Sequence, residues 1–331
     1  MKKYQIKKIT ILGAGAWGTA LAHLFSSVSE TVCLWAHEKN VVDSINQKHS
    51  NDQYLVGYKL EKNIVATSNI QDACFNTQMF VEAVPMVHLA SVMKTIDQSY
   101  FSKIPFLITS KGVYSEDLLL PTELLQTFGI ALNQMVVAVG PTFAKEIMQG
   151  DVSGFCVASQ NINYAQFVGN LLDRKHIATT YSDDLVGAQI GGVLKNIIAL
   201  GVGMLMGAGA GENLRALALV TGFQELHAYG LRKGAKSETL IGVAGLGDML
   251  LTSLSRTSKN YKAGFMVGEG RRDAVKDSFT ALPEGCNTVK LYFENDIFFQ
   301  TNMPFCSAVY RVFWAGEDPS ILVTVLRAER E

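Results

Sequence analysis

A lysine stands inside a long apolar stretch in the second half of the chain. Lys195 follows Gly191-Gly192-Val193-Leu194 and precedes Asn196-Ile197-Ile198. An amine in such a helix either reaches solvent along its own methylenes or is buried with partners. Burial lowers its pKa from about 10.4 toward the range that suits a general acid or base. Because Gly191 and Gly192 share its helix face, we expect room for a ligand beside the ammonium.

Two further charged residues could act with Lys195. Asp248, at the end of Ala244-Gly245-Leu246-Gly247-Asp248, would be its counter-ion, or else only the first residue of a helix. Lys111, in Ser110-Lys111-Gly112, would bring a second ammonium, unless it is an ordinary solvated lysine. A carboxylate raises the pKa of a nearby lysine whereas burial lowers it, and the sequence leaves open which effect is larger.

A glycine-rich segment lies near the start of the chain. Gly13-Ala14-Gly15-Ala16-Trp17-Gly18 fits the GxGxxG pattern and stands between an expected strand and an expected helix. In that context the glycines allow a tight turn and a close approach of the backbone to a pyrophosphate at the helix N-terminus. The segment predicts a dinucleotide site; a glycine turn without a ligand is the alternative.

The end of the second expected strand bears on the choice of dinucleotide. Glu38 lies 20 residues after Gly18, about where an acidic side chain binds the ribose 2′-hydroxyl of NAD. His37 and Lys39 flank it and could instead accept the 2′-phosphate of NADP, or lie in a solvated loop. The sequence does not decide between the two cofactors.

Segments of two kinds must position these residues in the first half. Continuous apolar runs predict strands buried on both faces of a parallel sheet. Their alternation with helical segments predicts an α/β fold with a Rossmann-type doubly wound sheet. The expected strands are 8–12, 31–35, 79–84, 106–109, 136–139 and 154–158, and segments such as 19–27 and 88–96 between them are expected helices.

The alternation stops near residue 184. The expected helices beyond it are 185–206, 214–229, 237–251, 261–268, 287–294 and 307–314. We therefore predict a dinucleotide-binding domain over residues 1–185 and an all-helical substrate domain over residues 186–331.

Ligands of an open parallel sheet bind beyond the carboxyl ends of its strands. Three motifs follow expected strands: Val84-Pro85, Ser110-Lys111-Gly112 and the segment from Gly140 to Glu146, GPTFAKE. The last resembles a turn into a helix, for which Thr142 would be the N-cap. We expect Lys111 to point its ammonium into the cleft.

Composition excludes several classes of function. With 29 basic and 30 acidic residues and a net charge of −1, the chain has no basic excess that would favour nucleic acid or an anionic membrane as its main partner. The six histidines show no metal-ligand spacing, and the five cysteines form no CxxC pair. We expect no metal and reduced, structural thiols in a cytoplasmic protein.

Two apolar stretches imitate membrane signals. Lys7-Lys8 followed by residues 9–22 looks like a signal peptide, but the glycine spacing suits a phosphate-binding turn better. The run over residues 197–210 is about 14 residues long, short of the ~20 that span a bilayer. We expect a buried helix there and no membrane span.

Taken in order, the motifs resemble those of the bacterial-type NAD(P)-dependent glycerol-3-phosphate dehydrogenases. The resemblance implies an oxidoreductase that interconverts dihydroxyacetone phosphate and sn-glycerol 3-phosphate with NAD or NADP, and so supplies glycerophospholipid synthesis. The matching segments span nearly the whole chain: GAGAWGTALA at 13–22, YLVGYKL at 54–60, VP at 84–85, SKG at 110–112, GPTFAKE at 140–146, GGVLKNIIALGVGM at 191–204, AGLGDMLLTSLSRTSKN at 244–260 and PEGCNT at 283–288.

The resemblance also implies roles for single residues. Lys195 would exchange the proton with the substrate's C2 oxygen, with Lys111 and Asp248 as further catalytic residues. Implied substrate contacts are Lys111, Gly140, Thr142, Lys195, Asp248, Thr252, Ser258, Lys259 and Asn260. Implied cofactor contacts are Gly13, Gly15, Ala16, Trp17, Gly18, His37, Lys111, Ala144, Lys259, Leu282 and Glu284.

The chain departs from the family pattern at two arginines. The family usually has arginine at the position of Lys259, in the phosphate-binding segment Ser258-Lys259-Asn260, and in a TRG segment where this chain has Thr221-Gly222. Arginine offers phosphate a bidentate fork, whereas lysine offers a point charge. We expect phosphate binding to survive with altered strength or selectivity, and Arg256 could compensate.

Two other functions stay open at the level of sequence. A related two-domain dehydrogenase could act on another phosphorylated or carboxylated hydroxy compound, which the departure at Lys259 motivates. A non-catalytic dinucleotide sensor would need neither Lys111 nor Lys195. Oligomeric state, with a homodimer as one possibility, and feedback regulation are not readable from the sequence.

Overall fold

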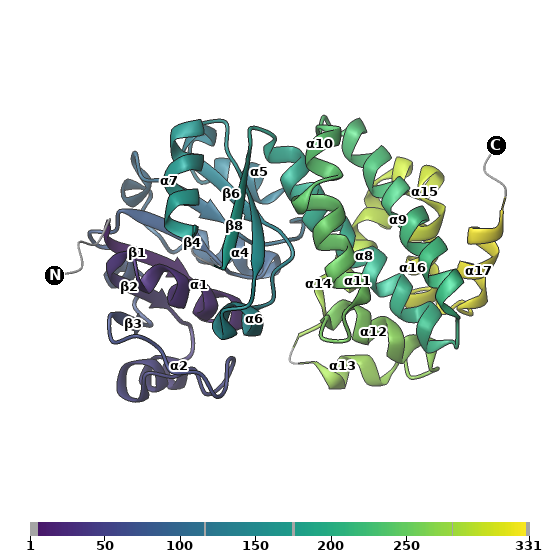
Figure 1. Ribbon diagram of the computed structural model, residues 1–331, viewed down its shortest axis with the longest axis horizontal. Helices are drawn as coiled ribbons and strands as arrows, with labels where there is room; N and C mark the ends of the chain where they lie inside the picture. Colours follow the sequence, from purple (N-terminus) through teal and green to yellow (C-terminus); the bar gives the residue numbers. More distant parts are fainter. Residues whose placement is uncertain (1–5, 116, 174–175, 280, 329–331) are drawn as a thin grey trace. The chain divides into compact units, whose positions relative to one another are not determined.

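The computed structural model describes residues 6–115, 117–173, 176–279 and 281–328 (Figure 1). The chain divides into two compact units, one of Met1–Ser110 with Pro121–Leu185 and one of Lys111–Leu120 with Val186–Glu331. Each unit has a hydrophobic core of its own. The segment Lys111–Leu120 thus belongs to the second unit, although in the sequence both of its neighbouring segments belong to the first unit.

The first unit is built on an eight-stranded sheet with the order β3-β2-β1-β4-β5-β6-β7-β8. Neighbouring strands are parallel except β6 and β7. The order β3-β2-β1-β4-β5-β6 is that of a doubly wound dinucleotide-binding sheet, so the predicted fold class is confirmed. The strands are β1 (Ile6–Leu12), β2 (Ser29–Trp35), β3 (Ile64–Thr67), β4 (Met79–Glu82), β5 (Phe106–Ile108), β6 (Met135–Val139), β7 (Ser153–Ala158) and β8 (Ile177–Ser182).

The sheet differs from the prediction at both edges. The edge strands β3 and β8 mix exposed with buried positions and so lack the continuous apolar run that marks the other strands in the sequence. The expectation of parallel strands throughout was wrong at β7, which pairs antiparallel with β6. An apolar run shows that a strand is buried, but it carries no information about the strand's direction.

The helices of the first unit connect the strands. The turns that follow β1, β4 and β5 all leave the carboxyl edge of the sheet, because these three neighbouring strands are parallel. The helices are α1 (Ala16–Ser26), α2 (Lys39–Asp43), α3 (Ile70–Cys74), α4 (Met86–Met93), α5 (Pro121–Gln126), α6 (Ala144–Gln149) and α7 (Ile162–Leu172), with shorter turns η1 (Ser44–Lys48), η2 (Gln98–Phe101) and η3 (Leu132–Gln134).

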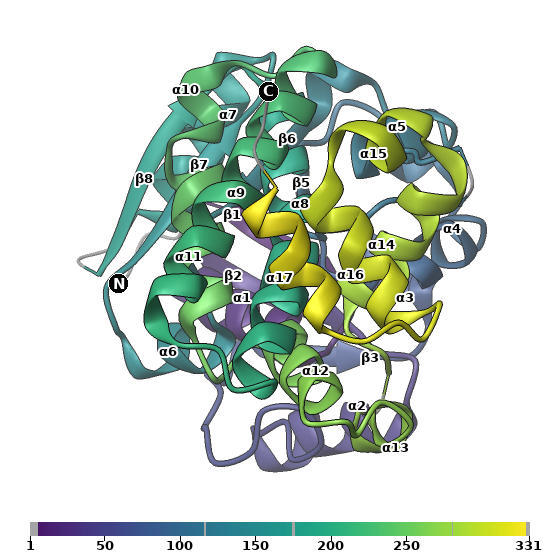
Figure 2. The same cartoon turned by 90° about the vertical axis from the view of Figure 1, so that its right-hand side faces the viewer.

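The second unit is helical over its described residues, apart from an isolated bridge between Tyr114 and Leu119. Figure 2 shows α16 and α17, which pack against each other. The helices are α8 (Leu185–Gly207), α9 (Glu212–Arg232), α10 (Ser237–Leu240), α11 (Asp248–Leu254), α12 (Lys259–Gly268), α13 (Ala274–Ser278), α14 (Glu284–Asn295), α15 (Ile297–Asn302), α16 (Pro304–Phe313) and α17 (Ser320–Arg327), with a π-helical turn η4 (Val243–Gly247) before α11.

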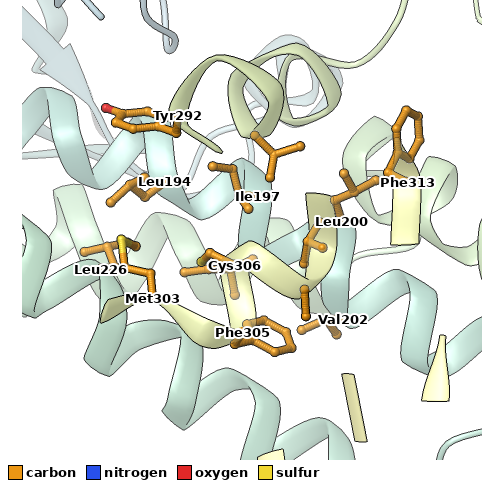
Figure 3. Close-up of a cluster of buried hydrophobic side chains, with 14 of the residues drawn as sticks. Leu194, Ile197, Leu200, Val202, Leu226, Tyr292, Met303, Phe305, Cys306 and Phe313 are labelled. Carbon is orange, nitrogen blue, oxygen red and sulfur yellow. The ribbon is translucent and has the colours of Figure 1, made fainter. Parts of the chain in front are cut away.

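Helix α8 runs through the core of this unit. Leu194, Ile197 and Leu200 of α8 pack among side chains from other segments of the unit, including Met303 and Phe305 (Figure 3). By length and composition α8 could cross a membrane, but 89% of its most apolar window is buried inside the protein. The expectation of a buried helix is confirmed, because other parts of the chain already cover the apolar side chains.

One predicted helix is broken in the structure. The segment 237–251 was expected to be continuous, but it forms α10, the turn η4 and then α11. At Gly245 a Cβ atom would lie 2.0 Å from the main-chain oxygen of Leu240, so the chain folds back on itself at a distance that only glycine permits. The break matters because it makes Asp248 the first residue of α11.

The five cysteines are buried free thiols. Burial raises the pKa of Cys74 and of Cys286 to about 12, and that of Cys156 to about 11. A thiol held in its protonated form is a poor nucleophile. The expectation of reduced, structural cysteines is confirmed.

Candidate active site

The amine of Lys195 is buried in the middle of α8. Its Nζ donates to Oδ1 of Asp248 at 2.5 Å and to the hydroxyl of Thr252 at 2.7 Å, and only 7% of its side chain is exposed. Asp248 and Thr252 lie one turn apart on α11, so both face the lysine. The Thr252 hydroxyl in turn donates to the main-chain oxygen of Asp248 at 2.7 Å. The expected counter-ion is therefore in place, and Lys195 does not extend to solvent.

Lys111 joins the same carboxylate from the segment Lys111–Leu120. Its Nζ donates to Oδ2 of Asp248 at 2.7 Å, so each oxygen of the aspartate holds one lysine. The Lys111 side chain is 18% exposed, against 1% for Asp248. Lys111 is thus no ordinary solvated lysine: it forms with Lys195, Asp248 and Thr252 a polar cluster, which we call the lysine cluster, within the second unit.

The electrostatics of the lysine cluster suit proton exchange. Burial lowers the pKa of Lys195 to about 7 against the opposing effect of Asp248, and the charge of Lys111 lowers it as well. Desolvation therefore outweighs the carboxylate, a question that the sequence left open. A group with this pKa is present in both its charged and its neutral form near neutral pH, as a general acid or base must be.

The two glycines before Lys195 do not leave room for a ligand, so that expectation was wrong. A Cβ atom on Gly191 would lie 2.6 Å from the main-chain oxygen of Ala244, and one on Gly192 would lie 3.3 Å from Cγ of Lys111. The space is filled by the backbone of η4 and by the Lys111 side chain. The glycines instead let η4 and Lys111 approach α8 closely enough for Asp248 to reach both amines.

The glycine-rich turn of the first unit has the features of a pyrophosphate cradle. Gly13 has φ +107°, and a Cβ atom on it would lie 2.7 Å from the main-chain oxygen of Ala83. A Cβ atom on Gly18 would lie 2.0 Å from the main-chain oxygen of Gly13. At Gly15 nothing lies within 4 Å of such an atom. Helix α1 starts at Ala16, and no side chain caps its first N–H groups. The open space and the uncapped helix end fit an anionic dinucleotide.

The end of β2 holds an acidic side chain in a fixed position. Oε1 of Glu38 accepts a hydrogen bond of 2.6 Å from the hydroxyl of Tyr54, which lies in the segment YLVGYKL. The carboxylate raises the pKa of Tyr54. His37 and Lys39 on either side are exposed. Acidic and basic side chains therefore both lie in the segment after β2 that was expected to meet the ribose.

The segment after β6 departs from the expected capping pattern. Helix α6 starts at Ala144 with Phe143 as N-cap, so the expectation that Thr142 caps it was wrong. The Thr142 hydroxyl donates instead to the main-chain oxygen of Gly140 at 3.2 Å, and the helix begins one residue later than a Thr142 cap would require. Gly140 is buried, whereas Thr142 and Ala144 are half-buried at the carboxyl edge of the sheet.

The segment expected to bind phosphate forms the start of α12. The hydroxyl of Ser258 caps this helix by accepting from the N–H of Tyr261, and Lys259 is exposed. Asn260 is buried; its amide donates to Asn196 at 2.9 Å, and its oxygen accepts from the N–H of Gly285 at 2.9 Å. Asn260 thus already ties α12 to α8 and α14. Within the segment Ser258-Lys259-Asn260, Lys259 is the residue whose side chain is exposed to solvent.

The remaining expected cofactor contacts lie at the start of α14. Leu282 and Glu284 are half-buried on either side of Pro283, the N-cap of α14. Thr221, which stands where the family usually has arginine, is buried in α9. Each of these residues lies in the second unit, as do Ser258, Lys259 and Asn260.

The sequence analysis did not single out two residues of the first unit that the structure places beside expected site residues. Tyr54 holds Glu38, and Glu82 at the end of β4 hydrogen bonds to the turn that precedes Lys111. A signal for Glu82 was present, because it is an acidic residue inside the apolar run 79–84. Tyr54 begins the segment YLVGYKL that matches the family, but its contact with Glu38 arises only through the fold.

A doubly wound sheet with a glycine-rich turn, together with a helical unit that buries a lysine against an aspartate, defines the class of two-domain nicotinamide-dependent dehydrogenases. The chain belongs within this class to the NAD-dependent glycerol-3-phosphate dehydrogenases. The family model for the N-terminus matches residues 8–165, and the model for the C-terminus matches residues 184–324.

Individual relatives agree with this assignment. The glycerol-3-phosphate dehydrogenase [NAD(P)+] of Bacillus pumilus is 33% identical and covers 98% of this chain and 94% of that protein. The enzyme of the same name from Erythrobacter litoralis is 34% identical over 98% of both chains. The crystal structure of glycerol-3-phosphate dehydrogenase from Coxiella burnetii has a TM-score of 0.89 at 27% identity, covering 97% of this chain and 99% of that one.

Proposed function

We propose that the protein is an NAD(P)-dependent glycerol-3-phosphate dehydrogenase, which interconverts dihydroxyacetone phosphate and sn-glycerol 3-phosphate. The observation that carries the proposal is the lysine cluster, in which Asp248 holds the buried amine of Lys195 and that of Lys111. It occurs in a chain whose two halves both match this family. The match over both halves does not favour another hydroxy compound as substrate.

Lys195 is the proton donor and acceptor of the proposed reaction. A bound nicotinamide supplies or takes up the hydride at the substrate's C2 atom. During ketone reduction the ammonium of Lys195 gives a proton to the C2 oxygen, and during alcohol oxidation the neutral amine takes it back. Its pKa of about 7 makes both directions accessible near neutral pH.

Lys111 and Asp248 set the electrostatics around this proton. The ammonium of Lys111 stabilises the negative charge that develops on the C2 oxygen, together with Lys195. Asp248 fixes the positions of the two amines through one oxygen each. Thr252 orients the Lys195 amine further by accepting one of its hydrogens.

The glycine-rich turn is the proposed binding site of the dinucleotide. Gly13, Gly15 and Gly18 admit the pyrophosphate, and Ala16 and Trp17 offer N–H groups at the start of α1. His37 contacts the adenosine ribose, and Ala144, Leu282, Glu284, Lys111 and Lys259 are further contacts. The comparisons support NAD or NADP as the cofactor, and the resemblance to the family favours NADPH.

The start of α12 is the proposed site of the substrate phosphate. Lys259 is exposed there and supplies the positive charge, while Ser258 and Asn260 hold the helix end in place. Gly140 and Thr142 are the proposed substrate contacts from the first unit.

We further propose a cytoplasmic enzyme that supplies glycerol 3-phosphate for glycerophospholipid synthesis. The buried position of α8 supports a chain without a membrane span. Residues 1–185 would be the dinucleotide-binding domain and residues 186–331 the substrate domain, with Lys111–Leu120 contributed to the latter. Net charge gives no reason to expect nucleic acid as a partner, and a homodimer is an assembly to test.

The test is oxidation of NADH and of NADPH by the purified protein in the presence of dihydroxyacetone phosphate, followed by nicotinamide absorbance. Turnover with this substrate, and far less with unphosphorylated or carboxylated hydroxy compounds and their ketones, supports the proposal. Cofactor binding without turnover of any substrate would point to a sensor instead.

A further inference from the structure

Glu82 is a carboxylate buried in the first unit without a charged partner. It ends β4, is 0% exposed, and lies in an otherwise apolar run, Met79 to Val84. In the part of the chain that the structure describes, no lysine, arginine or histidine forms an ion pair with it. Burying a carboxylate is costly unless its oxygens accept hydrogen bonds. The donors that Glu82 binds therefore indicate its role in the structure.

The carboxylate closes two neighbouring turns at the carboxyl edge of the sheet. Oε1 accepts from the N–H of Val84 at 2.7 Å, and Oε2 accepts from the N–H of Ser110 at 3.1 Å. Val84 follows β4 and Ser110 follows β5, the adjacent strand. A single side chain thus fixes the backbone at the ends of both strands.

The same residue is connected to the glycine-rich turn. Its main-chain oxygen accepts from the hydroxyl of Thr109 at 2.6 Å, and that hydroxyl accepts from the indole N–H of Trp17 at 3.0 Å. The next residue, Ala83, packs so closely on Gly13 that a Cβ atom there would lie 2.7 Å from the Ala83 oxygen. The turns after β1, β4 and β5 therefore form one hydrogen-bonded and packed assembly.

This assembly adjoins Lys111. The N–H that Glu82 holds belongs to Ser110, the residue directly before Lys111, whose amine bonds to Asp248. A shift of the Ser110 backbone moves the start of the segment that carries that amine. Burial raises the pKa of Glu82 to about 7, against the opposing effect of its hydrogen bonds to Ser110 and Val84.

We propose that Glu82 is a positioning residue of the dehydrogenase, which sets the glycine-rich turn for the dinucleotide and the Ser110–Lys111 backbone for catalysis. The inference rests on the proposed function for its catalytic half. The effect of Glu82 on the glycine-rich turn concerns cofactor binding, and it does not depend on which substrate the enzyme reduces.

The test compares Glu82→Gln with a matched control, Glu225→Gln. Glu225 is also a buried carboxylate whose two oxygens accept backbone N–H groups, those of Phe305 at 2.7 Å and Cys306 at 2.9 Å, but it lies in the core of the second unit. Glutamine keeps one acceptor oxygen and puts an amide N–H₂ against the second donor, so each variant loses one buried hydrogen bond.

We expect both variants to lower the melting temperature, and only Glu82→Gln to change function. Its Kd for NADH and NADPH, measured by nicotinamide fluorescence without substrate, should rise about fivefold, and its kcat should fall by a similar factor. Glu225→Gln should stay within about twofold of wild type in both quantities, since Glu225 contacts the start of α16 in the core of the second unit. Equal effects of the two variants, or an unchanged Kd and kcat in Glu82→Gln, would overturn the proposal.

A second variant covers the case in which Glu82→Gln does not fold. Thr109→Val keeps the side-chain shape but removes the hydroxyl between the Glu82 oxygen and the Trp17 indole. A raised Kd for NADH supports the proposal, and an unchanged Kd in the folded variant refutes it. Because this measurement needs no turnover, it is read independently of whether dihydroxyacetone phosphate is the substrate.

Discussion

The carboxylate of Asp248 lies between two lysines, with Oδ1 2.5 Å from Nζ of Lys195 and Oδ2 2.7 Å from Nζ of Lys111. Two ammonium groups so close would repel each other without the shared anion. Removal of the anion would leave two cations partly buried, which is costly. The arrangement therefore makes the protonation state of Lys195 depend on both Asp248 and Lys111.

Replacement of Lys195 by alanine removes the proposed proton donor. We expect turnover to fall by roughly 10²–10⁴, the usual contribution of general acid–base catalysis. Affinity for the dinucleotide should change little, because the glycine-rich turn belongs to the other unit. Steady-state kinetics and nicotinamide fluorescence measure the two quantities; turnover near that of wild type would show that another group handles the proton.

The pH dependence of the reaction follows from the lowered pKa of Lys195, about 7. Ketone reduction uses the ammonium, so kcat/KM should fall as the pH rises above that value and the amine loses its proton. Alcohol oxidation uses the neutral amine, so its kcat/KM should fall as the pH drops below the same value. These opposite profiles are measured with dihydroxyacetone phosphate and glycerol 3-phosphate.

A control separates this profile from the other group with a pKa of about 7, Glu82. In Glu82→Gln the break assigned to Lys195 should remain at the same pH, whatever happens to the rate. The substrate phosphate titrates near pH 6, about a unit lower. If kcat/KM for reduction stays flat from roughly pH 6.5 to pH 9, a range that spans the lowered pKa, Lys195 is excluded as the acid.

The choice of cofactor tests the position of Glu38. A carboxylate fixed by Tyr54 at 2.6 Å repels the 2′-phosphate of NADP if it faces the ribose. We expect Glu38→Ala to shift the ratio of kcat/KM values for NADPH and NADH toward NADPH. Tyr54→Phe is the matched variant, since it keeps the carboxylate and frees its position. An unchanged ratio in Glu38→Ala would place this side chain outside the pocket.

Lys259 is the main departure from the family pattern, and its exposure in the structure makes it testable. If it binds the substrate phosphate, Lys259→Ala should lower kcat/KM for dihydroxyacetone phosphate roughly ten- to a hundredfold, the loss of one charge-assisted hydrogen bond. Lys259→Arg should retain binding and could improve it through the bidentate fork.

The phosphate itself provides the control for Lys259. Weak activity on unphosphorylated dihydroxyacetone should change far less in Lys259→Ala than activity on the phosphate. Equal losses on both compounds would assign Lys259 to structure or cofactor binding. The absence of loss on either would make it a solvated surface charge, and Arg256, which is also exposed, would be the next residue to replace.

The sequence by itself determined the fold class and the identity of the chemical groups. Continuous apolar runs marked the central strands, and the glycine spacing marked the turn at Gly13, because a local pattern suffices for both. Lys195 stood out because a charge inside an apolar helix needs a partner. The edge strands β3 and β8, which mix exposed with buried residues, lacked such a pattern and were not predicted.

Tertiary structure alone decided how these groups act on one another. The sequence could not show that the glycines before Lys195 admit the backbone of η4 and the side chain of Lys111 rather than a ligand. It could not show that one carboxylate holds both amines, or that Glu82 joins the ends of two strands. Contacts between residues far apart in the chain, and the burial that shifts a pKa, arise only when the elements pack, so no local pattern encodes them.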